Sequence, residues 1–341
     1  MFKLSYRAKM RMKRLAIFLG ILGLILLLLW ICWMIWLQRY VVYTRDGVVI
    51  DFGRSSLALE NKEAETSPQQ ETIHVDIQLG DGQATQNRQE GLQVINGVYV
   101  NTAMLLEGVD GVREALAELE PGTAVLLDVK SKLGNFYYST DIQDASLTDS
   151  IDVAAMDALI DELAGRNCYL IARLPAFRDT DFARRNQSSG LSLSSGALWT
   201  DEEKYYWLDP ASDVVQSNLI QICRELRDLG FDEVVFTDFE IPDNGRIVYA
   251  SDVPKDEILK QAAALLVSSC TNEEFTVSFT GTIDFPLPEG QTRLYLENVD
   301  PQQADALVSQ SAAPDPLTQT VFLAQTRDTR FDAYCILRSL R

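Results

Sequence analysis

The feature that most constrains the fold is a regular alternation of two hydrophobic patterns over residues 93–341. Short runs of apolar, largely β-branched residues alternate with segments whose apolar residues recur every three or four positions. These patterns are typical of strands and helices respectively. Strands that are buried on both faces read as nearly continuous apolar runs, as in parallel sheets. Eight runs are predicted to be strands, at residues 93–101, 123–130, 168–174, 231–238, 274–280, 304–309, 318–324 and 331–337.

Helix-like segments separate most of these runs. A strand–helix repeat over about 250 residues is typical of an α/β fold of the TIM type, the (β/α)8 barrel. The connections shorten in the last third of the chain, so the barrel is expected to be incomplete or irregular there. Helices are predicted at residues 109–119, 150–166, 213–229, 255–269 and 291–299.

A doubly wound open sheet is the alternative fold. Such a sheet usually carries a glycine-rich, phosphate-binding loop after its first strand. Here the first strand ends at Asn101, and the segment that follows reads TAMLLEG. The absence of the glycine signature favours the barrel.

A long apolar segment precedes this body. It runs from Leu15 to Leu37 without a charged residue, and such a length is enough for a helix to cross a hydrocarbon core of about 30 Å. The tail before it, residues 1–14, holds six basic and no acidic residues. The positive-inside rule then predicts a single-pass protein of the cell membrane, with a cytoplasmic N-terminus and an extracytoplasmic C-terminal domain. A cleaved signal peptide is the alternative, although its apolar region would be shorter and would end in small residues.

Residues 38–92 are predicted to form a hairpin followed by a polar stalk. Two β-branched runs flank Asp46 and Gly47, a dipeptide typical of two-residue hairpin turns. Residues 53–92 are rich in Gln, Glu, Asn, Ser, Thr and Gly, which is typical of a flexible spacer. The barrel is expected to fill residues 93–341.

The charge of the chain excludes several functional classes. Its formal net charge is -19, although the first 39 residues are basic. The acidic body that follows repels polyanions, which argues against binding of nucleic acid. The chain has one histidine, His74, which argues against a Ser-His-Asp triad or a histidine-built metal site. No metal or cofactor is therefore expected.

Four cysteines lie in the body: Cys168, Cys223, Cys270 and Cys335. An even number of cysteines outside the cytoplasm allows disulfides. Each of the four lies in an apolar strand or helix pattern, however, which favours buried thiols.

Several polar residues follow the predicted strands at the end where a barrel holds its active site. Carboxylates can act as acid, base or nucleophile at an anomeric carbon, and aromatic rings stack on sugars. This combination predicts a site for a polysaccharide or oligosaccharide. Two plain alternatives stay open, since Asp128 and Lys130 could pair with each other and the tryptophans could only cover the barrel end. The candidates are Asn101, Asp128, Lys130, Arg173, Trp199, Trp207, Asp238 and Glu240.

At these residues the chain resembles a family of glycoside hydrolase-like proteins with an α-amylase-like barrel, catalogued as a domain of unknown function. The matching pieces are GVYV (97–100), AVLLDVKSKLG (124–134), YLIARLPAFRD (169–179), LWTDEEKYYWLDP (198–210) and LGFDEVVFTDFEIPDNG (229–245).

The resemblance implies a barrel, an extracytoplasmic location and a polysaccharide ligand. It also implies site roles for Asp128, Lys130, Arg173, Trp207 and Asp209, which match the family pattern.

One departure concerns the fourth strand, where the family usually reads like FDYIRFP and this chain reads FTDFEIP. Thr237 takes the position of the family aspartate, Asp238 that of the tyrosine and Glu240 that of the arginine. A shift of one residue turns a strand side chain to the opposite face. Asp238 therefore does not simply inherit the role of the family aspartate.

Three hypotheses about function follow. The first is a membrane-anchored glycosidase acting on cell-wall or capsular polysaccharide, with Asp128 or Asp238 as base or nucleophile, Glu240 as general acid and Arg173 steadying a carboxylate. The second is a catalytically degenerate barrel that binds glycan or an envelope partner without hydrolysis, as Thr237 suggests. The third is a scaffold of the cell envelope.

Overall fold

The computed structural model describes residues 41–44, 47–50, 91–249, 253–311 and 313–340. The chain divides into two compact units, residues 1–83 and 84–341. In the first unit, strands β1 (Val41–Thr44) and β2 (Gly47–Ile50) pair in antiparallel fashion, as a hairpin requires. Gly47, which was expected in the turn, is instead the first residue of β2 and pairs with Thr44. The apolar run at residues 15–37 lies outside the described residues, and no helix within the described ranges meets the length and hydropathy needed to cross a membrane.

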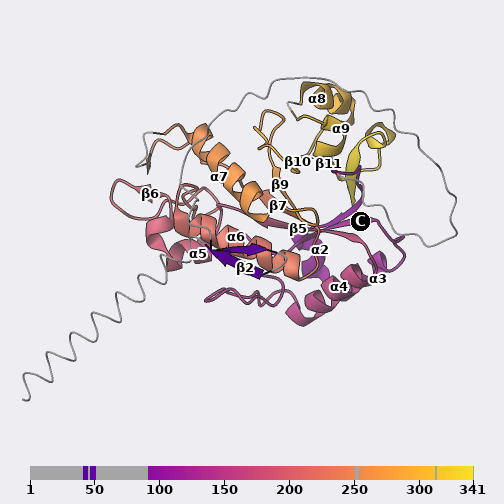
Figure 1. The fold of residues 1–341 in the computed structure, drawn as a ribbon, viewed down its shortest axis with the longest axis horizontal. Helices are drawn as coiled ribbons and strands as arrows, with labels where there is room; N and C mark the ends of the chain where they lie inside the picture. Colours follow the sequence, from indigo (N-terminus) through magenta and orange to yellow (C-terminus); the bar gives the residue numbers. More distant parts are fainter. Residues whose placement is uncertain (1–40, 45–46, 51–90, 250–252, 312, 341) are drawn as a thin grey trace, which may run out of the picture. The chain divides into compact units, whose positions relative to one another are not determined.

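The second unit contains a closed barrel of eight parallel strands, which confirms the predicted fold class (Figure 1). Each strand hydrogen-bonds to its neighbours, and the last strand pairs with the first to close the ring. Around the ring the strands are β3 (Asn96–Val100), β4 (Ala124–Asp128), β5 (Tyr169–Pro175), β7 (Glu233–Thr237), β9 (Thr276–Thr280), β10 (Leu294–Glu297), β11 (Thr320–Ala324) and β12 (Cys335–Ser339).

Helices cover the outside of the barrel because each has one apolar face. In α4 (Val153–Gly165), for example, Met156, Leu159, Ile160 and Leu163 are buried on one face, as a helix with 3.6 residues per turn requires. The other helices are α2 (Thr102–Glu107), α3 (Val109–Leu116), α5 (Thr180–Arg185), α6 (Asp213–Asp228), α7 (Lys255–Cys270), α8 (Ala304–Gln310) and α9 (Pro316–Gln319).

Shorter elements complete the unit. The two-residue strands β6 (Ser192–Leu193) and β8 (Ile247–Val248) pair in antiparallel fashion outside the barrel. Three 3₁₀ turns are η1 (Gln187–Ser189), η2 (Pro301–Gln303) and η3 (Thr329–Phe331).

Two predicted elements in the last third are exchanged. Residues 291–299 were expected to be a helix and contain strand β10, whereas residues 304–309 were expected to be a strand and lie in helix α8. Leu294, Tyr295 and Leu296 are all buried, and such a short apolar run has no periodicity that separates strand from helix. In α8, Ala304 and Val308 are buried four positions apart, which is a helical spacing. The barrel is closed by eight strands and is not incomplete. It is irregular in its last third, since residues 281–293 form no helix between β9 and β10.

The interior of the barrel consists of an apolar layer between two polar ones. The apolar side chains belong to one buried cluster that includes Tyr99, Leu126, Ile171 and Val235. Toward the carboxyl ends of the strands, the inward positions become polar. Toward the amino ends lies a fully buried ion pair.

That ion pair joins β7 to β10. Arg293 Nη1 contacts Glu233 Oε2 at 2.5 Å, and both side chains are at most 2% exposed. The hydroxyls of Tyr169 and Tyr295 donate to the Glu233 carboxylate at 2.9 Å each. Arg293 also donates to the carbonyl oxygens of Gln93 and Thr318. Every charge in this layer is thus hydrogen-bonded, as buried charges require.

Candidate active site

The central feature of the carboxyl end is a guanidinium shared by two carboxylates. Asp128 and Arg173 are register partners at the ends of β4 and β5, and Arg173 Nε donates to Asp128 Oδ1 at 2.7 Å. Arg173 Nη1 donates to Glu297 Oε1, at the end of β10, also at 2.7 Å. Asp128 and Glu297 are the last residues of their strands, and Arg173 lies two residues before the end of β5. The Asp128 and Arg173 side chains are 13% and 14% exposed, and that of Glu297 is 38% exposed.

Asp128 is held on its other side by the start of α2. Its Oδ2 accepts hydrogen bonds from the backbone N–H of Thr102 at 2.7 Å and from the Thr102 hydroxyl at 2.9 Å. With the bond from Arg173, the carboxylate accepts three hydrogen bonds and keeps one orientation. The Thr102 hydroxyl also lies 3.3 Å from the hydroxyl of Tyr137.

The charge states of this cluster follow from its surroundings. Burial lowers the pKa of Arg173, but the Asp128 and Glu297 carboxylates outweigh that effect and raise it above the ordinary value, so the guanidinium stays charged. Burial raises the pKa of Tyr137, while the hydrogen bond with Thr102 opposes the increase. Tyr137 is therefore a neutral phenol beside a fixed carboxylate.

A second cluster surrounds Asp238, directly after β7. Its Oδ1 lies 3.7 Å from Lys132 Nζ and 3.6 Å from Arg178 Nη1, and its Oδ2 accepts a hydrogen bond from the Thr237 hydroxyl at 3.1 Å. The backbone of Asp238 is left-handed, with φ of 48°, a conformation that aspartate tolerates better than most residues. In a regular strand, the side chains of Thr237 and Asp238 would point to opposite faces. The left-handed conformation at Asp238 turns its side chain so that it accepts a hydrogen bond from the Thr237 hydroxyl.

Arg178 ties a long segment after α5 to this cluster. Its Nη2 contacts Asp201 at 2.5 Å and Glu203 at 3.1 Å, and its guanidinium lies over the ring of Tyr205 at 4.6 Å. The Trp207 indole N–H donates to the same Asp201 carboxylate at 3.0 Å. Burial opposes the ionisation of Asp201, but these hydrogen bonds and the Arg178 charge hold its pKa below the ordinary value.

The two clusters lie at the same end of the barrel. Strand β5, which carries Arg173, pairs directly with β7, and Pro175 is the register partner of Thr237, the residue before Asp238. The Asp128 and Asp238 clusters together are called the charged patch below.

Some predicted site residues have structural roles. Lys130 pairs with Asp179, and both side chains are 2% exposed. The Asn101 side chain caps α2 by accepting from the N–H of Met104. Asp209 accepts hydrogen bonds from the N–H of Ala211 and the hydroxyl of Tyr249.

Three further candidates lie at the periphery or in the core. Trp199 and Trp207 are buried in the main hydrophobic cluster, so neither presents an open ring face. Glu240 is exposed and makes no hydrogen bond or ion pair among the described residues. Asp128 and Arg173 are brought into direct contact, and Asp238 lies in the adjoining cluster.

The sequence analysis missed Glu297 and Lys132 as site residues. Arg178 and Tyr205 follow the third strand in the sequence, but no site role was predicted for them. Glu297 ends a run that was predicted to be a helix, so its position at a strand end was hidden. Arg178 follows Pro175 and lies beyond the end of β5, where strand spacing no longer indicates direction. No group of three or more metal-ligating side chains occurs in the described part of the chain.

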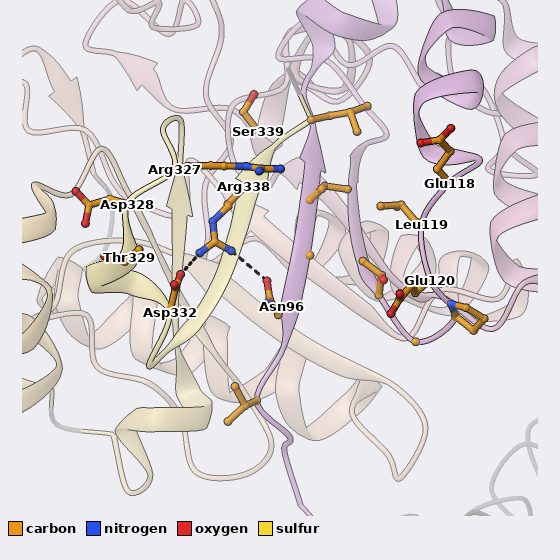
Figure 2. Close-up of a pocket in the computed structure, with 17 residues that line it drawn as sticks. Asn96, Glu118, Leu119, Glu120, Arg327, Asp328, Thr329, Asp332, Arg338 and Ser339 are labelled. Carbon is orange, nitrogen blue, oxygen red and sulfur yellow. Dashed lines mark hydrogen bonds and ion pairs between the residues drawn. The ribbon is translucent and has the colours of Figure 1, made fainter.

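Two surface hollows lie away from this patch. One has a volume of about 1130 Å³ and lies on the outer face of β12 and β3, where Arg338 bridges Asp332 and Asn96 (Figure 2). The other, of about 480 Å³, lies beside α5 and α6. Neither is lined by the charged residues at the carboxyl end.

Comparison with solved structures supports the fold. The exo-β-N-acetylglucosaminidase of family GH20 from Vibrio harveyi, solved with N-acetylglucosamine, has a TM-score of 0.50 and 9% identity over 68% of this chain. A hypothetical protein from Ruminiclostridium thermocellum has a TM-score of 0.46 and 21% sequence identity, and the match covers 53% of this chain and 96% of that protein. The GH36 α-galactosidase AgaA from Geobacillus stearothermophilus has a TM-score of 0.47 and 12% sequence identity over 74% of this chain.

The chain spans 42% of the Vibrio harveyi enzyme and 40% of the Geobacillus stearothermophilus enzyme. No curated protein matches the chain. A family model described as "Putative glycosyl hydrolase domain" (DUF4015) matches residues 97–268. These residues include β3, β4, β5 and β7, and with them Asp128, Arg173 and Asp238. The chain therefore belongs to this family of glycosyl hydrolase-like domains.

Proposed function

We propose that the barrel binds a glycan at the carboxyl ends of its strands and hydrolyses it with the carboxylates of Asp128 and Glu297. The observation that carries the proposal is the guanidinium of Arg173, which bonds both groups at 2.7 Å. Because both bonds end on the same guanidinium, the two carboxyl groups face each other across one arginine head group. Glycosidases place their two carboxyl groups about 5 to 9.5 Å apart.

The two carboxyl groups differ in the way this reaction requires. Asp128 accepts three hydrogen bonds and is fixed in one orientation, which suits a nucleophile or base. Glu297 is the more exposed of the two, which leaves it able to reach a bound substrate. As general acid it would first release Arg173 and take up a proton, which it then donates to the leaving group. Asp238, held by Lys132 and Arg178, is the alternative to Asp128 as base or nucleophile. Glu240 is the alternative to Glu297 as proton donor.

The substrate and location are part of the proposal. An acidic body favours a neutral or weakly charged polysaccharide of the cell wall or capsule over a polyanion. The apolar run at residues 15–37 and the basic tail before it support a single-pass anchor with the barrel outside the cytoplasm. Protease accessibility of the barrel in intact cells tests this topology.

Binding without hydrolysis is the second candidate. It is favoured by the end of β7, where Thr237 offers a hydroxyl and where the next carboxylate, Asp238, lies between two cations. In that case the patch would hold a sugar through its charged and phenolic groups without breaking a bond.

One experiment separates the two candidates. The purified full-length chain is incubated with a panel of cell-wall and capsular polysaccharides, and released reducing ends and bound ligand are measured separately. For the hydrolase we expect Asp128→Asn and Glu297→Gln to abolish product release while binding persists. Glu162→Gln, an exposed change on α4, is the matched control. Binding by the wild type without product release would support the second candidate, and absence of both would refute the proposed site.

A further inference from the structure

The surface hollow of about 480 Å³ lies between α5, the first half of α6 and the loop that follows β4. The loop contributes residues 142–144, α5 contributes its last turn, and α6 contributes residues between 213 and 221. Pockets for small ligands span about 300 to 1,000 Å³, so this hollow has the size of a ligand site. It is called the amide groove below.

Uncharged polar residues form the largest group in the amide groove. They are Gln143, Asn186, Ser217, Asn218 and Gln221. Apart from that of Asn186, their side chains form no hydrogen bond or ion pair with another described residue. An amide offers two donors and an acceptor oxygen, and a hydroxyl both donates and accepts. These side chains are therefore available to a ligand whose own groups donate and accept, as sugar hydroxyls do.

Helix α6 contributes one continuous stripe to the groove. Val214, Ser217, Asn218 and Gln221 recur at intervals of three or four residues, which places them on one side of the helix. Val214 is 51% exposed, and Ile142 from the loop also lines the groove. The groove thus combines hydrogen-bonding groups with apolar surface, and a sugar ring presents both hydroxyls and an apolar C–H face.

The charges in the groove select against an anionic ligand. The charged residues that line it are Asp144, Asp213 and Arg185, and Arg185 is already paired with Asp181. A bound anion would therefore meet two carboxylates and an engaged guanidinium. An extended peptide is also disfavoured, because binding through its main chain uses an exposed sheet edge, and helices and a loop build this groove.

The groove lies one short helix away from the charged patch. Lys132 belongs to the Asp238 cluster, and its carbonyl oxygen accepts from the N–H of Thr180, the first residue of α5. The other end of α5 lines the groove. With six residues, this helix is about 9 Å long. An oligosaccharide of several units is long enough to lie along it.

We propose that the amide groove is a second carbohydrate-binding site, which holds an uncharged stretch of the polysaccharide whose neighbouring part lies at the charged patch. The path of the chain rests on the proposed function, whereas binding in the groove depends on separate residues. A ligand held at both places gains affinity, because its second contact is intramolecular.

The test measures binding of three uncharged hexasaccharides, cellohexaose, laminarihexaose and chitohexaose, to the purified full-length chain by titration calorimetry. The Asp128→Asn protein serves as the reference, so that the ligand stays intact. In this background the double change Asn218→Ala and Gln221→Ala should weaken binding of a hexasaccharide at least fivefold. Gln261→Ala removes an exposed amide of α7 and is the matched control, which should keep the affinity of the reference.

A second variant and a shorter ligand make the test independent of one substitution. Ser217→Arg places a bulky cation in the groove and should weaken binding in the same way, with an unchanged melting temperature as the check on folding. The corresponding disaccharides should bind the reference protein more weakly than the hexasaccharides do. This difference should shrink in both groove variants.

The outcomes separate this inference from the proposed function. Groove-dependent binding without product release by the wild type would refute hydrolysis and support the second site. Binding that Arg173→Lys weakens and neither groove variant changes would overturn the second site and leave the charged patch as the binding site. Absence of saccharide binding, or groove-dependent binding of an uncharged peptide in its place, would also overturn the second site.

Discussion

Arg173 donates to the carboxylate of Asp128 at 2.7 Å from the directly paired position of the neighbouring strand. The same guanidinium reaches Glu297 on β10, so one side chain organises the polar end of the barrel. Because lysine keeps the charge but cannot form both bonds at once, Arg173→Lys should reduce glycan turnover or binding at least tenfold. It should lower the free energy of unfolding by about 1 to 3 kcal/mol.

Urea unfolding and a binding assay measure both effects of Arg173→Lys. Arg113→Lys is the control, because Arg113 forms an exposed ion pair with Asp110 on α3, and such pairs contribute about 0 to 1 kcal/mol. Equal stability and unchanged binding in the two variants would contradict an organising role for Arg173.

The ion pair at the opposite end of the barrel should matter for stability alone. Glu233→Gln leaves the buried charge of Arg293 without its partner, and Arg293→Met does the same to Glu233. Either change should lower the free energy of unfolding by about 3 to 5 kcal/mol. The double variant should lose less than the sum of the two single losses. A double-mutant cycle by urea unfolding measures this coupling, and strictly additive losses would show that the two groups do not interact.

Buried phenols predict a loss of stability in alkali. Burial raises the pKa of Tyr138, Tyr169 and Tyr295 above the ordinary value, and the negative charges of Glu225 and Glu233 add to the effect. In the unfolded chain these phenols ionise near about pH 10. Their contribution is therefore complete below about pH 10 and is lost as the pH rises toward the folded pKa.

The slope of this alkaline loss gives the test. Above its unfolded pKa, each such tyrosine should lower the free energy of unfolding by about 1.4 kcal/mol for every pH unit. Tyr138→Phe should make the slope shallower by about that amount, in addition to a constant loss from the missing hydrogen bond with Glu225. Urea unfolding at several alkaline pH values measures the slope. The same slope in wild type and variant would mean that Tyr138 ionises normally in the folded chain.

Arg178 should control the order of the segment after α5. Arg178→Met removes contacts with Asp201, Glu203 and Asp238, so we expect faster hydrogen exchange in residues 198–209. Arg184→Met is the matched control, since Arg184 is exposed and, within the described part of the chain, interacts only with the ring of Tyr206. Similar exchange in both variants would show that the segment is held by its backbone bonds.

A glycine at the start of the barrel should tolerate no side chain. A Cβ at Gly97 on β3 would collide with the carbonyl oxygen of Ala124 on β4, so Gly97→Ala should lower stability by about 3 kcal/mol or more. Gly165→Ala is the control, because nothing lies within 4 Å of its added Cβ. It should be neutral or stabilising by up to about 1 kcal/mol. Thermal unfolding of both variants decides the comparison.

Most of the barrel could be predicted because its strands are buried on both faces. The runs that became β4, β5, β7 and β9 are continuous and apolar, and each is followed or preceded by an unambiguous helix. The pattern failed where elements are short: β10 has four residues and α8 has seven, too few for periodicity to separate the two states.

The candidate site was predictable only in part. Asp128 ends β4 and Arg173 is its register partner near the end of β5, so their contact follows from the strand order. The position of Glu297 could be predicted only if residues 294–297 were recognised as a strand. Arg178 lies three residues after the end of β5, where strand alternation no longer predicts the direction of a side chain. The direction of the Asp238 side chain depends on a left-handed backbone conformation. Aspartate tolerates this conformation, but the sequence does not indicate that it occurs here.

The two charged layers inside the barrel restrict how it can close. Glu233 and Arg293 meet at one end, and Asp128, Arg173 and Glu297 meet at the other. If β7 or β10 shifted its register by one position, its charged residue would turn outward toward the helices. The oppositely charged partner would then remain buried in the interior without a counterion. Loops at either rim can therefore change in length or sequence while the stagger of the strands stays the same.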